Sequence, residues 1–217
     1  MTDLLVLDLD DTLYLETDYV RSGFRAADGW ASQTLGWDGL FEYCWGLFEA
    51  GSRERIFDSA VHRFQGREDS DATQQLVHVY RSHQPDIRLE DDAAAFLDRM
   101  NDQQLAVALL TGGRPDSQRL KVEALSLEGR FEFITYSGER GPQFDKPHPW
   151  AFEKLALLVG ARYRRLTYVG DNPARDIAAP LQLGWRTIRI RRAHSLHEQT
   201  RTPGGVDEIT SFDQLDS

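Results

Sequence analysis

The sequence predicts an α/β protein, a doubly wound parallel sheet into which a separate helical segment is inserted. The first observation is that short apolar runs alternate with segments of helical periodicity, which is typical of a parallel sheet covered by helices. The second is that one stretch of about seventy residues, between the first and second apolar runs, has helical periodicity alone. The 217 residues are enough for one large domain with such an insertion.

The first predicted strand is the run Leu4-Leu5-Val6-Leu7, which stops at Asp8 and has the composition of a parallel strand buried on both faces. Further strands are predicted at 105–110, 131–135, 166–169 and 187–190, with a last edge strand at 206–209 and a closing half-turn at 212–215. Helical patterns lie between them, near 90–100, 115–127, 149–159 and 174–182. Strands and helices therefore alternate along the second part of the chain.

The inserted segment is predicted to be a helical cap. Its aromatic residues Phe41, Trp45 and Phe48 follow the i, i+4, i+7 spacing of one helix face. Glycine-containing stretches at 36–39 and 66–71 are expected to separate its helices, and Pro85 is the expected point of return to the sheet. We therefore predict a core domain of residues 1–14 and 85–217 and a cap domain of residues 15–84. The cap aromatics are expected to form its core rather than a ligand cage.

Composition excludes several classes of protein. Asp and Glu number 35 against 25 Lys and Arg, and the net charge of −10 argues against nucleic acid polymers and anionic membrane surfaces as partners. Hydrophobic residues make up 41% of the chain, which is incompatible with disorder, and no run approaches the roughly 18 apolar residues of a membrane span. Cys44 is the single cysteine, and no signal peptide is expected at the N-terminus, so we expect a cytoplasmic protein. The oligomeric state is left open.

Acidic residues follow two of the predicted strands. Asp8 and Asp10 come directly after the first strand, and Gly170-Asp171 ends the strand at 166–169, with Asp176 five residues later. The carboxyl ends of parallel strands meet at one edge of a sheet, where ligands of open α/β folds bind. Carboxylates gathered there repel one another unless their pKa values rise or a cation binds. Hard oxygen ligands of this kind suit Mg²⁺.

Two further strand ends supply groups for an anion. Thr111 ends the strand at 105–110 and is followed by Gly112 and Gly113, whose backbone N–H groups can cradle an anion. Lys146 lies in the segment Asp145-Lys146-Pro147-His148-Pro149 and would add a positive charge. Taken alone, a strand-end Asp is equally well explained as a helix cap. An ordinary loop is the better interpretation of Thr111-Gly112-Gly113 alone, and a solvated surface position is the default for a lysine.

Together and in this order, these residues resemble the haloacid dehalogenase-like superfamily of hydrolases. Its first motif, D-x-D-x-T after an apolar strand, is matched by LLVLDLDDTL, and its second, a strand-terminal Thr or Ser, by LLTGG. Its third, a lysine ahead of a helix, is matched by DKPHPWAF, and its fourth by GDNPARD. The pattern TGG departs from the more usual Thr-Asn-Gly or Ser-Asn-Gly. The resemblance implies a Rossmann-like core, and the place of the insertion resembles the subgroup with a helical cap between the first and second motifs.

The resemblance implies a phosphomonoesterase that works through an aspartyl-phosphate. Asp8 would be the nucleophile, and Asp10 would protonate the leaving oxygen and then take a proton from water. Thr111 and Gly112 would bind the transferring phosphoryl group, and Lys146 would screen the charges of Asp8 and the phosphoryl group.

The resemblance also implies Mg²⁺ as the cofactor. Asp8, the backbone carbonyl of Asp10 and Asp171 would ligate the ion, with Asp176 as a further ligand or as a partner behind the ligands. The expected substrate is a small phosphorylated metabolite.

Other functions of such a fold fit these residues less well. Asp10 and the magnesium-binding acids argue against a dehalogenase, and a chain without a lysine before Lys121 argues against a phosphonatase. A receiver module of a signalling pathway would present its acidic pair and its phosphoacceptor in another order. A phosphomutase stays open, as does a non-catalytic phosphate-binding member of the superfamily, although Asp8, Asp10, Lys146 and Asp171 are all present. The identity of the substrate is left open, because no motif describes the cap.

Overall fold

The computed structural model describes residues 2–215 and divides the chain into two compact units. The core unit comprises the chain up to Thr17 and from Ile87 onward, and the helical unit is Asp18–Asp86. Within residues 2–215, no helix combines the length and the apolar character that a bilayer crossing requires.

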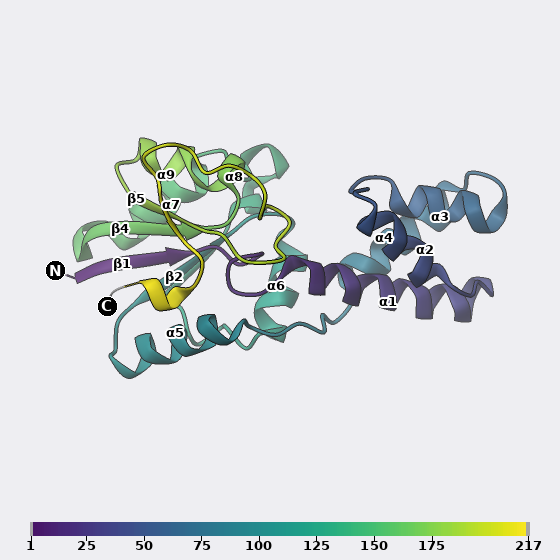
Figure 1. The fold of residues 1–217 in the computed structure, drawn as a ribbon, viewed down its shortest axis with the longest axis horizontal. Coiled ribbons are helices and arrows are strands. Elements are labelled where there is room, and N and C mark those ends of the chain that lie inside the picture. Colours follow the sequence, from purple (N-terminus) through teal and green to yellow (C-terminus); the bar gives the residue numbers. More distant parts are fainter. Residues whose placement is uncertain (1, 216–217) are drawn as a thin grey trace. The chain divides into compact units, whose positions relative to one another are not determined.

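The core unit contains a six-stranded sheet in which every neighbouring pair is parallel. Its strands are β1 (Thr2–Leu7), β2 (Val107–Thr111), β3 (Phe133–Tyr136), β4 (Tyr163–Gly170), β5 (Arg186–Ile190) and β6 (Asp207–Ile209). They lie in the order β3-β2-β1-β4-β5-β6, and Figure 1 labels the four central strands of this order. The predicted α/β class, its doubly wound sheet and the late edge strand are confirmed.

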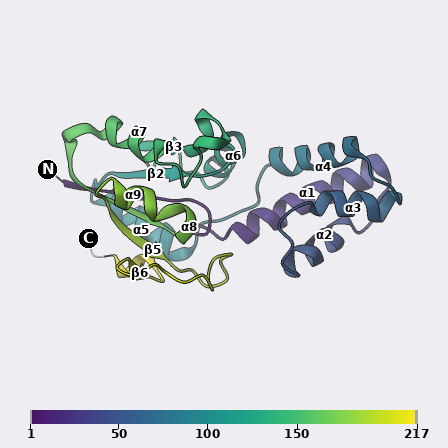
Figure 2. The same ribbon diagram turned by 90° about the horizontal axis from the view of Figure 1, so that it is seen from above.

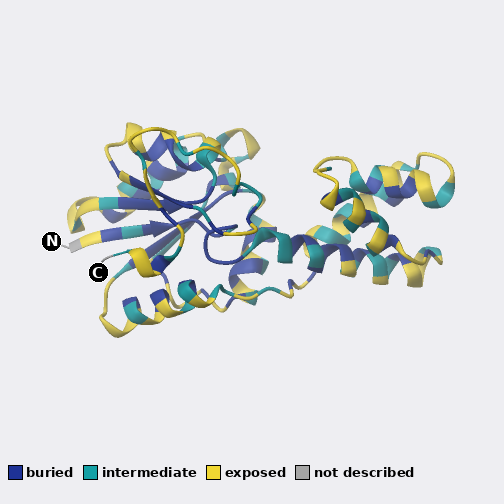
Figure 3. Cartoon of the chain, viewed as in Figure 1, coloured by how far each residue is buried: buried dark blue, intermediate teal, exposed yellow. Residues whose placement is uncertain are grey.

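Helices cover both faces of this sheet. They are α5 (Asp91–Asp102), α6 (Pro115–Ala124), α7 (Trp150–Val159), α8 (Pro173–Asp176) and α9 (Ala178–Gln182), with short 3₁₀ turns η1 (Ser137–Arg140), η2 (Pro142–Phe144), η3 (Gly160–Arg162) and η4 (Phe212–Gln214). Figure 1 shows α5 and α6 on one face of the sheet and α7, α8 and α9 on the other. The central strands are buried along most of their length (Figure 3).

The chain changes direction across the sheet between β1 and β4. From β1 it moves outward through β2 to β3, and from there it crosses back to β4 and continues to β5 and β6. Parallel strands connected in opposite directions leave a crevice outside their carboxyl ends, because the two following loops diverge. The ends of β1 and β4 therefore mark where a ligand site is expected.

Two predicted helices of the core differ from the observed ones. The single helix expected at 174–182 is interrupted at Ile177, because Pro180 has no amide hydrogen to donate to the carbonyl of Asp176. The helix expected to reach residue 127 ends at Ala124, and Ser126 adopts a left-handed conformation with φ of 53°. Both differences concern ends and breaks of helices, not their existence.

The helical unit is built from α1 (Glu16–Leu35), which begins just before it, α2 (Leu40–Glu49), α3 (Ile56–Gln65) and α4 (Ser70–Ser82), as Figure 2 shows. The breaks predicted at 36–39 and 66–71 separate α1 from α2 and α3 from α4. Gly36, Gly39 and Gly66 take positive φ values there, which suits glycine. A further break, between α2 and α3, was not expected from the sequence.

Aromatic side chains form the centre of the helical unit. The ring of Phe24 in α1 lies 6.4 Å from that of Phe48 in α2, 5.7 Å from Phe57 in α3 and 5.5 Å from Tyr80 in α4, measured between centroids. Gly23 allows this approach, because a Cβ there would lie 2.5 Å from the ring of Tyr80. One helix thus contacts the other three through a single aromatic cluster.

Candidate active site

The first site residue, Asp8, follows β1 directly. Its backbone N–H donates to the carbonyl of Val169 at 2.9 Å, so Asp8 continues the pairing of β1 with β4. The chain then turns sharply, with Asp11 at a φ of 50°. The carboxylate of Asp11 accepts hydrogen bonds from the backbone N–H groups of Glu16 and Leu196, both at 2.8 Å, and so fixes the loop behind the site.

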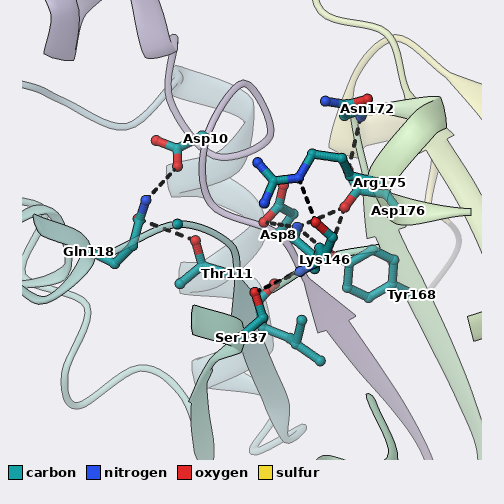
Figure 4. Close-up of polar contacts among 12 residues, drawn as sticks. Asp8, Asp10, Thr111, Gln118, Ser137, Lys146, Tyr168, Asn172, Arg175 and Asp176 are labelled. Atoms are coloured by element: carbon teal, nitrogen blue, oxygen red, sulfur yellow. Dashed lines mark hydrogen bonds and ion pairs between the residues drawn. The ribbon is translucent and has the colours of Figure 1, made fainter. Parts of the chain in front are cut away.

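Lys146 joins Asp8 to Asp176. Its Nζ donates to Oδ1 of Asp8 and to Oδ1 of Asp176, each at 2.7 Å, and to the hydroxyl of Tyr168 at 2.9 Å (Figure 4). All three charged side chains are buried. Burial raises the pKa of Asp8 to about 7, although Lys146 acts in the opposite direction. Burial alone would lower the pKa of Lys146, but Asp176 and Asp8 raise it above its ordinary value.

Asp171 completes a buried group of three carboxylates. One oxygen each of Asp8, Asp171 and Asp176 lies within 4.8 Å of the others. Burial, with the charges of Asp176 and Asp8, raises the pKa of Asp171 well above its usual range. Within residues 2–215, Oδ2 of Asp171 is buried without a hydrogen-bond partner. A buried carboxylate oxygen is expected to have a partner, and the chemistry of this donor set fits Mg²⁺.

The three carboxylates are not equally available to a metal. Oδ1 of Asp176 accepts from Lys146 and Tyr168, and its Oδ2 accepts from the backbone N–H of Asn172 at 2.9 Å. Gly170 leaves room for this side chain, since a Cβ at that position would lie 2.7 Å from Oδ2. Both oxygens of Asp176 are thus engaged by the protein, which favours a role behind the ligands over direct coordination.

The loop after β2 lies beside these groups. A Cβ on Gly112 would lie 2.8 Å from Nη2 of Arg175 and 2.9 Å from Cε of Lys146, so no larger residue fits without displacing them. The backbone N–H of Gly113 donates to the carboxylate of Asp145 at 3.1 Å. Thr111 is buried, its hydroxyl donates to Oε1 of Gln118 at 3.2 Å, and it does not line the pocket described below. The structure thus places Thr111 at the predicted strand end but turns its hydroxyl toward α6.

The carboxylate of Asp10 has different hydrogen-bond partners from that of Asp8 (Figure 4). Its Oδ1 accepts from Nζ of Lys121 at 2.6 Å and from the hydroxyl of Tyr14, and its Oδ2 accepts from Nε2 of Gln118 at 2.9 Å. Burial by itself would raise the pKa of Asp10, but Lys121 and the three hydrogen bonds lower it below its ordinary value. The two acids at the end of one strand therefore have opposite pKa shifts.

A pocket of about 120 Å³ lies at these strand ends. Its lining consists of polar and charged residues and two glycines: Asp8, Asp10, Glu16, Gly112, Gly113, Gln118, Lys146, Asp171, Asn172, Arg175, Asp176 and His197. All belong to the core unit. The predicted residues Asp8, Asp10, Gly112, Lys146, Asp171 and Asp176 are thus brought together.

Sequence reasoning missed several lining residues. Arg175 donates to Asp145 at 2.6 Å and to the carbonyl of Lys146 at 3.1 Å, and its place next to Asp176 was the one available signal. Burial, with the charge of Asp10, raises the pKa of Glu16 to about 7. His197 lies 2.8 Å from the side-chain amide of Asn172. It belongs to an irregular segment that carries no motif.

The sequence is similar to those of known phosphatases. A "Phosphoserine phosphatase" from Thermus thermophilus is 31% identical over 64% of this chain and 55% of its own length, so the chain spans little more than half of that relative. A "Glyceraldehyde 3-phosphate phosphatase" from Methanopyrus kandleri is 25% identical over 98% of this chain and 93% of its own.

The fold has close counterparts among solved structures. The HAD-hydrolase YfnB from Bacillus subtilis, solved bound to magnesium, superimposes with a TM-score of 0.67 at 17% identity, over 98% of this chain and 96% of its own. The sequence model of the haloacid dehalogenase-like hydrolases matches residues 2–184. The chain therefore belongs to the haloacid dehalogenase-like hydrolase family.

Proposed function

We propose that this protein is a magnesium-dependent phosphomonoesterase that hydrolyses a small phosphorylated metabolite through an aspartyl-phosphate on Asp8. The observation that carries the proposal is the buried contact of Asp8 with Lys146, beside an oxygen of Asp171 that lacks a partner among the described residues. Phosphatases among the relatives that match the chain support the same reaction class.

In the first step, a carboxylate oxygen of Asp8 forms a bond to phosphorus while the bond from phosphorus to the leaving oxygen breaks. Lys146 and the backbone at Gly112 offset the charge on the phosphoryl oxygens. Asp10 gives a proton to the leaving oxygen. The pKa of Asp10 is below its ordinary value, so it must rise before Asp10 can hold a proton. The negative charge of a bound substrate raises it, because a nearby like charge disfavours the ionised carboxylate.

In the second step, Asp10 takes a proton from water as the water oxygen bonds to phosphorus. The bond between phosphorus and Asp8 then breaks, which releases inorganic phosphate and restores the carboxylate. Asp8, Asp171 and the backbone carbonyl of Asp10 would hold Mg²⁺, which supplies charge neutralisation at the phosphoryl oxygens. Asp176 would act through Lys146, which it holds at 2.7 Å.

The test is phosphate release from a panel of small phosphomonoesters, with Mg²⁺ and with excess EDTA. We expect release that EDTA abolishes and added Mg²⁺ restores. Asp8→Asn should be inactive, whereas Asp3→Asn, an exposed acid of the same strand, should match the wild type. Full activity in EDTA would contradict the metal assignment, and isomerisation without phosphate release would indicate a phosphomutase. We also propose a cytoplasmic location, which is consistent with a sequence whose single cysteine, Cys44, cannot form an internal disulfide.

A further inference from the structure

The inner face of α6 carries two polar residues that contact Asp10, the proposed acid/base. Gln118 and Lys121 lie one turn apart and are both buried, next to the apolar Val122. Nζ of Lys121 lies 2.6 Å from Oδ1 of Asp10, and Nε2 of Gln118 lies 2.9 Å from Oδ2. Each oxygen of Asp10 therefore has its own donor on one helix.

Gln118 also connects Asp10 to Thr111 at the end of β2. Its Oε1 accepts from the hydroxyl of Thr111 at 3.2 Å while its Nε2 donates to Asp10, so the orientation of the amide is set by the two contacts together. Thr111 is a residue of β2, and Asp10 belongs to the loop after β1. One side chain thus links the end of β2 to the loop after β1, the two segments that would receive the phosphoryl group.

The fold alone does not require a lysine at position 121. A buried ion pair rarely stabilises a protein more than apolar residues of similar size would, because both charges lose their hydration. The side chain of Lys121 is 4% exposed, and an apolar residue would suit the inner face of a helix that packs on the core. Lys121 and Lys146 are two of only three lysines in the chain, and each pairs with an acid of the first motif.

We propose that Gln118 and Lys121 are positioning residues that hold the carboxylate of Asp10 where it can transfer a proton to the leaving oxygen. Lys121 provides the charged contact, and Gln118 sets the direction of the carboxylate relative to Thr111. This assignment rests on the proposed function. Both residues would act through the carboxylate of Asp10, so the expected defect is one of proton transfer, not of phosphate binding.

Substrates whose leaving groups differ in basicity distinguish a defect in proton transfer from a defect in phosphate binding. The leaving group of p-nitrophenyl phosphate departs without a proton, whereas that of an alkyl phosphate such as glycerol 1-phosphate needs one. In Lys121→Met we expect kcat for glycerol 1-phosphate to fall by about 10²-fold, within the range of general acid catalysis, and kcat for p-nitrophenyl phosphate to fall only a few-fold. KM should change little for either substrate, and Lys121→Arg should restore much of the loss, because it keeps a cationic donor.

Gln118→Glu tests the second residue without a change in size. It removes the N–H donor to Asp10 and places a like charge beside it, so the same selective loss is expected, with a smaller amplitude than in Lys121→Met. Lys154→Met and Gln182→Glu make the same chemical changes on α7 and α9, at residues outside the pocket lining, and should match the wild type. If Lys121→Met does not fold, Gln118→Glu still tests whether α6 orients the carboxylate of Asp10.

A wild type that releases no phosphate in the presence of Mg²⁺ would refute the proposed function itself. An Asp10→Asn variant without selective loss on glycerol 1-phosphate would refute the acid/base role of Asp10. If the wild type and Asp10→Asn behave as expected, then equal losses on both substrates in Lys121→Met and Gln118→Glu, or no loss, would overturn the positioning role alone. Selective losses in both variants would support it.

Discussion

The pocket of the core unit and the centre of the helical unit are both buried, but different interactions hold them together. Acids line the pocket around the buried Lys146, and three of them, Asp8, Glu16 and Asp171, have raised pKa values. The centre of the helical unit is aromatic. Among its described residues the ion pairs lie at the surface, as in Arg55–Asp58, where the side chains are 74% and 44% exposed.

Two arginines of the helical unit also lie against aromatic rings. Arg21 lies over the ring of Trp45 at 4.7 Å and pairs with Asp18, and Arg53 lies over Phe48 at 4.1 Å. Both guanidinium groups therefore lie against aromatic rings of the same unit. Buried like charges reduce stability and create reactivity, whereas aromatic packing adds stability and little chemistry. Substitutions in the two regions should therefore change different measurements.

The largest expected effect is that of Asp8→Asn, which should change turnover but not stability. Asp8→Asn should lower kcat by on the order of 10⁴-fold or more, as loss of a nucleophile does. Its melting temperature should stay close to that of the wild type, because the amide removes a charge that burial disfavours and Lys146 keeps its ion pair with Asp176. Phosphate release and thermal unfolding measure the two effects, with Asp3→Asn as control. A strong loss of stability would show that Asp8 is needed for folding as well, and would weaken the comparison.

Lys146→Met should affect both activity and stability. It removes a cation from between Asp8 and Asp176, and breaking a buried ion pair in this way costs about 4 kcal/mol. Urea denaturation at neutral pH without Mg²⁺ measures the cost, with Lys154→Met as control. A carboxylate whose folded pKa is raised stabilises the fold as pH falls, because the folded state then binds more protons. The deficit should therefore shrink between pH 8 and pH 5, and a deficit that is constant over this range would contradict the explanation.

Phe24→Ala should destabilise the helical unit by about 3 kcal/mol, because it leaves a cavity between three aromatic rings. Hydrogen exchange should report faster exchange in α1, α3 and α4, with β1 and β4 unchanged. Phe41→Ala removes a partly exposed ring of the same unit and should have a smaller effect. Equal loss of protection in the central strands would show that the two units unfold together, and would contradict the expectation that the two regions respond separately to substitution.

The smallest effect concerns a charged contact of the core outside the pocket. Asp92 accepts from the backbone N–H of Phe212 at 2.8 Å and from Arg192 at 2.9 Å. Burial would raise its pKa, but these donors lower it. A depressed folded pKa stabilises the protein above the unfolded pKa, and this stabilisation is lost as pH falls through the folded value.

Asp92→Asn should therefore cost about 2 kcal/mol at pH 7, as expected for hydrogen bonds to a charged group. The difference from the wild type should narrow below about pH 4, the ordinary pKa of Asp. Urea denaturation at pH 7 and pH 3 measures it, with the exposed neighbour Asp91→Asn as control. The same deficit at both pH values would exclude the ionised carboxylate as its source.

The sequence by itself determined the sheet and the place of its ligand site. Apolar runs that stop at Asp8, Thr111 and Asp171 mark strand ends, and parallel strands bring their carboxyl ends to one edge. Sequence pattern is enough for this inference, because apolar runs mark buried strands and the helices between them make successive strands parallel. The limits of the helix expected at 174–182 were less predictable, since Pro180 permits either a kink or an end.

Only the tertiary structure decided which groups meet inside the pocket. On sequence grounds Gln118 and Lys121 are ordinary polar residues of a helix, yet they contact Asp10 from 108 and 111 positions away. The hydroxyl of Thr111 turns to Gln118 instead of the pocket, and both oxygens of Asp176 are engaged by the protein. Periodicity tells which face of a helix is buried, but the partner of a buried polar group depends on the packing of elements that are distant in the chain.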